Sequence, residues 1–173
     1  MIEAIEKIIT GLRVVPLLAG CAFLVACATT TDTLGDKLSA PLARQVTQSA
    51  HCGLTGPGLA YVQTSERLQQ MLELPAQNMA IQQLRQVDLA KEHLVFVTLG
   101  EKPTGGHSVS LASAEMKNND KTLRLVMAVR APAPGTMVSQ VITSPCVVLA
   151  VPATGWLEIR VSGVRDSDLV VKL

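Results

Sequence analysis

The part of the chain that decides the fold is the segment 94–129, which reads LVFVTLGEKPTGGHSVSLASAEMKNNDKTLRLVMAV. Its hydrophobic residues recur with a period of two, which is typical of β-strands. Gly and polar residues separate the strands, and Asn118-Asn119-Asp120 is typical of a hairpin turn between the last two. The segment therefore predicts paired strands.

The same pattern continues to the end of the chain. The connections expected between successive strands are 131–135 and 152–155, which are rich in Pro and Gly. Ser144-Pro145 indicates an edge position or a bend, because proline cannot donate a ladder hydrogen bond. The predicted strands are 94–99, 107–116, 122–129, 137–143, 146–151 and 157–161, with a short closing strand at 169–173.

Helices are expected only on the N-terminal side of this sheet. After a short strand at 59–63, Thr64 or Ser65 can cap a helix that Pro75 stops, with apolar residues at helical spacing between them. A second, weaker helical pattern covers 77–85. The predicted fold class is α+β: a mainly antiparallel sheet of six to eight strands, with one or two helices in the N-terminal third of the mature domain.

Composition limits the classes of function. Of the 173 residues, 48% are hydrophobic and 17% charged, so the chain can bury a core and is not a disordered protein. Fifteen Lys and Arg face fourteen Asp and Glu, and the aromatic residues are one Trp, one Tyr and two Phe. A basic surface and stacking rings are what nucleic-acid binders use, so no nucleic-acid partner is expected.

The N-terminus is typical of an export signal. An uncharged apolar stretch follows Arg13 and ends in Leu24-Val25-Ala26-Cys27, which resembles the lipobox of bacterial lipoproteins. We expect a signal peptide at 1–26, lipid (palmitate) on Cys27, a spacer at 27–46 and one domain at 47–173. Leu18-Ala19-Gly20-Cys21 has the same pattern, so Cys21 is the alternative lipidation site; an uncleaved anchor helix at 8–28 is a further alternative.

This reading sets the expected compartment. Two or more acyl chains hold a protein stably on a bilayer, whereas one chain does not. Ala28 follows Cys27 in place of the Asp that usually retains lipoproteins at the inner membrane. The expected location is the cell envelope, anchored by lipid to the outer membrane and facing the periplasm.

If Cys27 carries the lipid, two thiols remain in the mature chain, Cys52 and Cys146. The cell envelope is oxidising, so the prediction is a Cys52–Cys146 disulfide. The alternative is a pair of buried, inert thiols. Lipidation at Cys21 instead would leave Cys27 as an odd third cysteine.

A family resemblance rests on several short motifs. From the first strand the chain continues into Gly100-Glu101-Lys102-Pro103-Thr104-Gly105-Gly106-His107. Further matching residues are Val87-Asp88-Leu89-Ala90-Lys91-Glu92, Ala131-Pro132-Ala133-Pro134-Gly135 and Val141-Ile142-Thr143-Ser144-Pro145-Cys146. Over 52–161 the chain resembles the PrcB family, named for a subunit of a surface-protease complex. The resemblance implies a non-catalytic envelope domain that associates with a protease or another protein. His107 departs from the family, which usually has an aromatic residue there.

The Pro-Thr-Gly-Gly turn is the most specific of these motifs. Pro103 fixes its own φ, and the two glycines allow positive φ, so the sequence predicts a rigid, protruding hairpin tip that offers backbone groups to a partner. The alternative is that the turn only reverses the chain between two paired core strands. The predicted partner-binding residues are Lys102, Pro103, Thr104, Gly105, Gly106 and His107.

Parts of the sequence also suggest two functions other than protein binding. Pro103-Thr104-Gly105-Gly106 is similar to one loop of chagasin-like inhibitors of cysteine peptidases, so an inhibitor using 102–107 is the alternative function, although the other inhibitor loops are absent. A thiol enzyme would need Cys146 beside His51 or His107.

No enzymatic activity, metal or cofactor is expected. The ligand-type residues His51, Cys52, His93 and His107 lack metal-site spacing, and the carboxylates are scattered rather than paired. Trp156 is expected in the core, with exposure as a partner anchor as the alternative.

Overall fold

The computed structural model describes residues 41–117, 119 and 121–173. The expected signal peptide, both candidate lipidation sites (Cys27 and Cys21) and the spacer up to residue 40 lie outside the described residues. The α+β prediction is confirmed within the described part, which has eight strands and two short helices. They are β1 (Arg44–Ser49), β2 (Pro57–Val62), α1 (Ser65–Leu72), α2 (Ile81–Arg85), β3 (Glu92–Leu99), β4 (Ser108–Lys117), β5 (Thr122–Arg130), β6 (Cys146–Pro152), β7 (Glu158–Ser162) and β8 (Leu169–Lys172).

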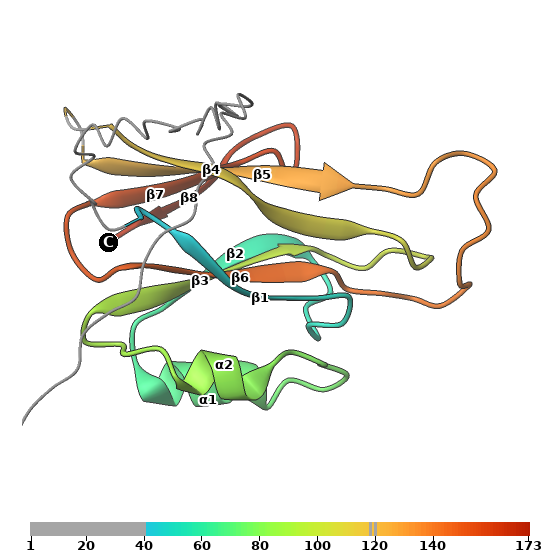
Figure 1. Ribbon diagram of the computed structural model, residues 1–173, viewed down its shortest axis with the longest axis horizontal. Helices are drawn as coiled ribbons and strands as arrows, with labels where there is room; N and C mark the ends of the chain where they lie inside the picture. Colours follow the sequence, from blue (N-terminus) through green and yellow to red (C-terminus); the bar gives the residue numbers. More distant parts are fainter. Residues whose placement is uncertain (1–40, 118, 120) are drawn as a thin grey trace, which may run out of the picture. The chain divides into compact units, whose positions relative to one another are not determined.

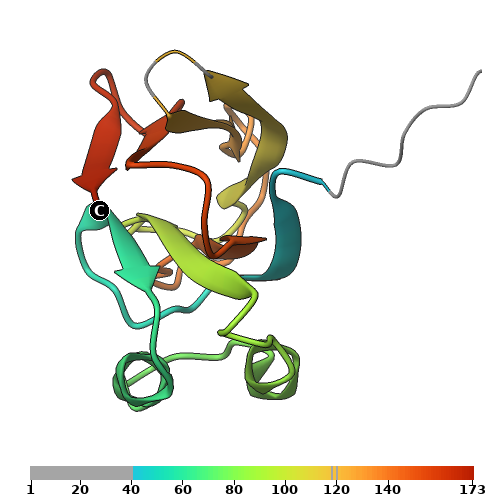
Figure 2. The ribbon, with the colours of Figure 1, turned by 90° about the vertical axis from the view of Figure 1, so that its left-hand side faces the viewer.

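The strands form two four-stranded sheets that face each other (Figures 1 and 2). The first sheet has the order β1-β6-β3-β2, and all its neighbours are antiparallel. The second has the order β4-β5-β7-β8, in which β5 and β7 are parallel. The chain therefore alternates between sheets: β3 and β6 belong to one, and β4 and β5 between them belong to the other.

The first sheet is buried on both faces because the second sheet covers one and the helices cover the other (Figure 2). On β3, Val95 and Val97 belong to the core between the sheets, whereas Leu94 and Phe96 belong to the core beneath the helices. Since successive strand residues point to opposite faces, both sets must be apolar. This explains why β3 and β6 are hydrophobic runs rather than alternating ones.

The first helix follows its sequence signals. Thr64 is the N-cap of α1, and its hydroxyl accepts a hydrogen bond from the Arg67 N–H at 3.3 Å. Leu68, Met71 and Leu72 are the buried face. Within the described part of the chain, no helix combines the length and the apolarity that a membrane crossing needs.

The second helix is shorter than predicted: it begins at Ile81, whereas the pattern favoured 77–85. The reason is that Gln77 makes other bonds. Its side chain donates to the Leu72 carbonyl at 2.9 Å and accepts from the Met79 N–H at 3.0 Å, and its backbone forms a bridge with Cys52. Met79 is buried against the sheet by this connection.

The prediction of a strand at 137–143 is wrong. Because β5 and β6 lie in different sheets, residues 131–145 form a long crossing instead of a hairpin, and no strand runs along 137–142. Thr143 makes only an isolated bridge with Lys102. The connection 152–155 likewise crosses between sheets, so it does not join a hairpin pair.

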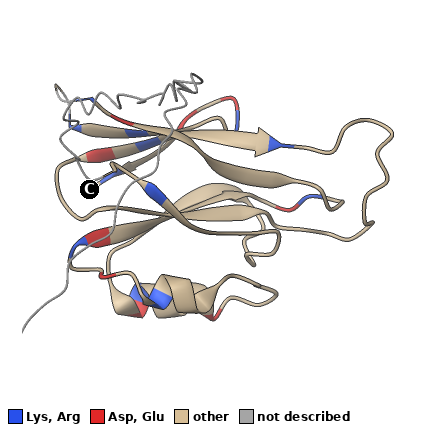
Figure 3. Ribbon diagram, viewed as in Figure 1, with Lys and Arg blue, Asp and Glu red and all other residues tan. Residues whose placement is uncertain are grey.

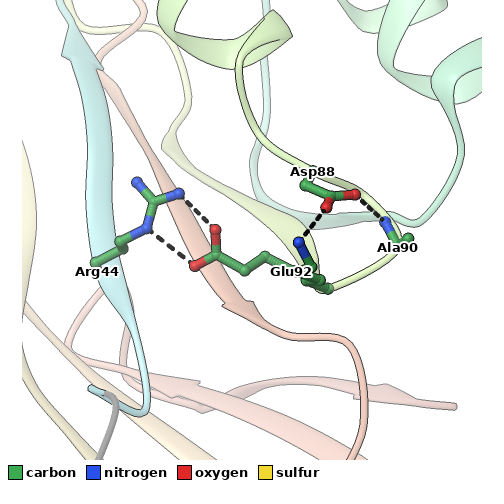
Figure 4. Close-up of polar contacts among 5 residues, drawn as sticks. Arg44, Asp88, Ala90 and Glu92 are labelled. Carbon is green, nitrogen blue, oxygen red and sulfur yellow. Dashed lines mark hydrogen bonds and ion pairs between the residues drawn. The ribbon is translucent and has the colours of Figure 1, made fainter.

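The ordered sheet begins earlier than the expected domain boundary. The expected spacer covers 27–46, but β1 starts at Arg44, which pairs with Ala150 on the side of β6 opposite β3. Arg44 also forms a bidentate ion pair with Glu92 across β6, at 2.9 Å and 2.6 Å (Figure 4). The hydrogen bond with Glu92 raises the pKa of Arg44.

The figure also shows Asp88, at the turn before β3, which accepts from the Ala90 N–H (Figure 4). Its second carboxylate oxygen pairs with Lys91 at 3.0 Å. The Lys91 hydrogen bond, helped by the Ala90 N–H, lowers the pKa of Asp88. These contacts fix the entry into β3 at the end of the strand remote from Gly100.

Candidate functional site

Two loops cross between the sheets at the same end of the described domain (Figure 1). One, residues 100–107, leads from β3 to β4; the other, residues 131–145, leads from β5 to β6. We call the two together the double loop. It contains every residue predicted to bind a partner, together with the Pro-rich stretch of the second loop.

Backbone hydrogen bonds hold the two loops together. The N–H of Lys102 donates to the Thr143 carbonyl at 2.8 Å, and the Thr143 N–H donates back at 2.9 Å. The Gly105 N–H donates to the Ser139 carbonyl at 2.9 Å, and the Thr143 hydroxyl donates to the Thr104 carbonyl at 2.9 Å. Polar groups that the prediction left for a partner are therefore satisfied inside the molecule.

The prediction of a protruding hairpin tip at 102–107 is consequently wrong. Gly105 is buried, and a Cβ on Gly106, whose φ is +85°, would lie 3.3 Å from side-chain atoms of Pro132 and of Val138. The alternative of a simple reversal is wrong as well, because β3 and β4 lie in different sheets and do not pair. The turn instead packs against the neighbouring loop, residues 131–145.

Exposure along 102–107 confirms that only part of the turn reaches solvent. Pro103 and Gly106 are exposed, whereas Lys102, Thr104 and His107 are half-buried. A loop that inserts into a peptidase cleft needs a free tip, so this packed turn gives no support to the chagasin-like alternative. The exposed surface of the double loop comes chiefly from its second loop.

That second loop carries exposed apolar side chains. Met137 is 98% exposed, Ile142 68% and Val141 51%. No Lys, Arg, Asp or Glu occurs in residues 131–157, and Figure 3 accordingly shows the second loop in tan. The sequence pattern missed this surface because the apolar and β-branched residues of 137–143 favoured a strand; the flanking Pro-rich stretch and Ser144-Pro145 were the signals against one.

A pocket of about 210 Å³ opens beside the double loop. Ile142, Thr143 and Ser144 form one wall, and Glu101 stands beside them. The opposite side comes from the segments before and after the first helix. The remaining lining residues are His51, Gly53, Leu54, Thr55, Pro75 and Ala76.

The walls of the pocket are tied to one another. The Ser144 hydroxyl accepts from the N–H groups of Cys52 at 3.0 Å and Gly53 at 3.2 Å. Gly53 has φ +68°, and a Cβ there would lie 2.4 Å from the Pro75 carbonyl oxygen. Since only glycine fits this approach, the wall at 53 and the wall at 75 are held in close contact.

The predicted cysteine pair stands directly behind these walls. Cys52 and Cys146 lie at disulfide distance, with their Cα atoms 6.0 Å apart, and both are fully buried. The pairing joins the segment that carries His51 and Gly53 to the residue that follows Ser144-Pro145. It links residues 94 apart in the sequence, next to the lining residues Gly53 and Ser144.

The histidines do not converge on one site. His51 lines the pocket, and His107 belongs to the double loop, but His93 lies at the other end of β3, opposite Val151. There the Tyr61 hydroxyl and His93 Nδ1 are 2.6 Å apart, and burial lowers the pKa of His93. In the described ranges, no three His, Cys, Asp or Glu residues are grouped to hold a metal ion.

Trp156 lies in the core between the sheets and is only 6% exposed. Its packing corresponds to the expected core position and not to the exposed partner anchor.

Comparison with known proteins gives one family match. Residues 94–152 match the family model described as PrcB C-terminal. This segment runs from β3 to the end of β6 and contains both crossing loops. No curated protein and no solved structure matches the chain.

Proposed function

We propose that this chain, whose residues 94–152 match the PrcB C-terminal family model, is a non-catalytic subunit of a cell-envelope complex that binds a protein partner through the double loop. The family name points to a protease complex, so we propose a protease as that partner. The observation that carries the proposal is the exposed apolar surface of Met137, Val141 and Ile142 on the uncharged second loop.

The energetics favour a protein surface as the binding target. Burying one large aliphatic side chain contributes about 1.5 to 3 kcal/mol, and clustered exposed apolar groups mark interaction sites. The hydrogen bonds between the loops already hold the backbone at Lys102, Gly105 and Thr143. A loop ordered before binding loses little conformational freedom on docking.

Several contacts support a binding role over a catalytic one. A thiol enzyme needs a free sulfur with a base in reach, and the Cys146 sulfur is joined to Cys52 and fully buried. The Tyr61 hydroxyl and His93 Nδ1 are 2.6 Å apart, but neither residue lines the pocket. We therefore propose a protein with no enzymatic activity.

The proposed setting is the periplasmic face of the outer membrane. Lipid on Cys27, or on Cys21 in the alternative, would keep the domain at the bilayer surface next to a membrane-associated partner. The oxidising envelope suits a Cys52–Cys146 disulfide. Replacing Cys27 with Ser tests the anchor: the proposal expects the processed chain to lose its added lipid mass and its membrane association.

A differential pull-down from solubilised membranes tests the docking surface. Ile142→Asp places a charge on the double loop, whereas Leu157→Asp makes the same change at a residue of similar exposure, 59%, beyond the opposite end of β6. We expect the Ile142 variant to lose its partner and the Leu157 variant to retain it. Equal recovery by both variants would refute docking through this loop.

A further inference from the structure

We infer that the pocket beside the double loop receives one large apolar side chain, of leucine or phenylalanine size, from an extended segment of the partner in which a Lys or Arg stands next to that side chain. The inference rests on the proposed binding function and names the chemistry that this surface would recognise. In this interface the pocket would select the partner's side chain, and the exposed second loop would provide apolar contacts around it.

The size of the pocket suits a single side chain. Its volume is about 210 Å³, and its surface is mainly apolar, with Leu54, Pro75, Ala76 and Ile142 among the lining residues. A cavity of about 150 Å³ with apolar walls is large enough to hold a benzene ring. A leucine or phenylalanine side chain therefore fits, and a whole folded element does not.

Charge sets the neighbouring residue. Among the described residues, Glu101 is the only carboxylate that lines the pocket, and no Lys or Arg lines it. Glu101 is exposed, its backbone N–H is bonded to the Thr55 carbonyl at 2.9 Å, and its carboxylate forms no ion pair with any described residue. A cation beside the inserted side chain would meet this carboxylate at the rim.

Two other titratable groups lie close to Glu101. Lys102 forms an antiparallel backbone bridge with Thr143, and consecutive extended residues direct their side chains to opposite sides, so Lys102 does not line the pocket. His51 is the remaining ionisable residue of the lining. The rim consequently favours a cationic neighbour over an anionic one.

The pocket exists before any partner arrives. Its walls are joined by the Cys52–Cys146 pair and by the hydrogen bonds from Cys52 and Gly53 to Ser144. Preformed pockets bind more tightly because little ordering accompanies binding. This rigidity is what allows a side chain of one size to be selected.

Methyl NMR of the full chain in detergent micelles tests the inference with defined probes. The Ile142 methyl reports on the pocket, while those of Ile81 in α2 and Ile159 in β7 serve as internal references. Acetyl-leucyl-arginine amide should shift the Ile142 signal saturably and leave the two references unchanged. Acetyl-glycyl-arginine amide should produce no saturable shift.

A charge variant separates the two parts of the inference. Glu101→Gln should weaken the leucyl-arginine probe about two- to fivefold, the range for an exposed ion pair, while Glu115→Gln on β4 should not change its affinity. Acetyl-leucyl-glutamate amide should bind less well than the arginine probe.

Absence of a saturable Ile142 shift, or an equal response to the glycyl probe, would overturn the pocket. An unchanged affinity in Glu101→Gln would overturn the cationic neighbour. If the peptide-probe results fail in this way while partner recovery still depends on Ile142, the inference is wrong and the proposed function stands. If partner recovery does not depend on Ile142, the proposed function fails on its own test.

Discussion

At the scale of single residues, two glycines with similar backbone geometry differ in how closely they are packed. Gly163, between β7 and β8, has φ +87°, and a Cβ there would lie 2.5 Å from the Met127 carbonyl oxygen of β5. Gly135, in the double loop, has a similar φ of +80°, but no atom lies within 4 Å of its added Cβ. Comparing the two glycines therefore separates the cost of a steric clash from the cost of a positive φ.

Gly163→Ala should therefore destabilise the protein by roughly 3 kcal/mol or more, because the clash with a core strand adds to the positive-φ cost. Gly135→Ala should cost only about 1 to 2 kcal/mol, the backbone term alone. Urea unfolding of both variants measures the difference. Equal losses of unfolding free energy would show that the Met127 contact does not matter.

The residue scale also explains what the sequence predicted well. The roles of Thr64 and Pro75 at the ends of α1 follow from local chemistry, and the cysteine pairing follows from the number of cysteines. These predictions agree with the structure. Glu101 and Ile142 were not identified as neighbours, because the pocket brings together segments near 51, 75, 101 and 142. Such a juxtaposition depends on topology, which local patterns do not contain.

At the scale of elements, apolar composition predicted the buried strands correctly but also predicted a strand where the apolar residues stay exposed. Residues 122–127 alternate and pair with β4 and β7, whereas 137–142 hold two apolar pairs around Ser139-Gln140 and cross between sheets. The parallel pairing of β5 with β7 could not be predicted from the sequence either, because it depends on the chain changing sheets at 152–155. Because residues 137–143 were predicted to form a strand, the double loop was not predicted.

The N-terminus of α1 yields a prediction with a defined sign. The pKa of Glu66 is lowered, first by a hydrogen bond from its own backbone N–H and then by one from the Thr64 hydroxyl. A carboxyl with a lowered folded-state pKa stabilises the fold above its unfolded pKa and loses that contribution as the pH falls through the folded value.

Thr64→Ala should raise the pKa of Glu66 toward its ordinary value and cost about 1 kcal/mol of stability through the lost cap on the Arg67 N–H. Thr64→Ser keeps a hydroxyl and should retain both properties. Carboxyl-carbon NMR against pH and urea unfolding measure the two effects. The same Glu66 pKa in both variants would contradict the assigned contact.

At the scale of the whole molecule, the Cys52–Cys146 link connects the segment before β2 to the start of β6. Closing a loop of this length stabilises a fold chiefly by restricting the unfolded chain, and loss of such a link typically costs about 2 to 5 kcal/mol. Reduction should therefore lower the urea midpoint, followed through the fluorescence of buried Trp156.

A double variant provides the control for that experiment. Cys52→Ala with Cys146→Ala should start at the lower midpoint and show no further change with reductant. A wild-type midpoint that is insensitive to reductant, under conditions in which free thiols are detected, would contradict a stabilising disulfide.

The central claim is that the double loop is where another protein docks. Photo-crosslinking in cells that make the anchored chain tests it most directly, with a benzoylphenylalanine residue placed either at Met137, 98% exposed in the double loop, or at Leu157, 59% exposed beyond the far end of β6. We expect one reproducible protein adduct from position 137 and none from position 157. Adducts from position 157 alone, or equal adducts from both, would contradict it.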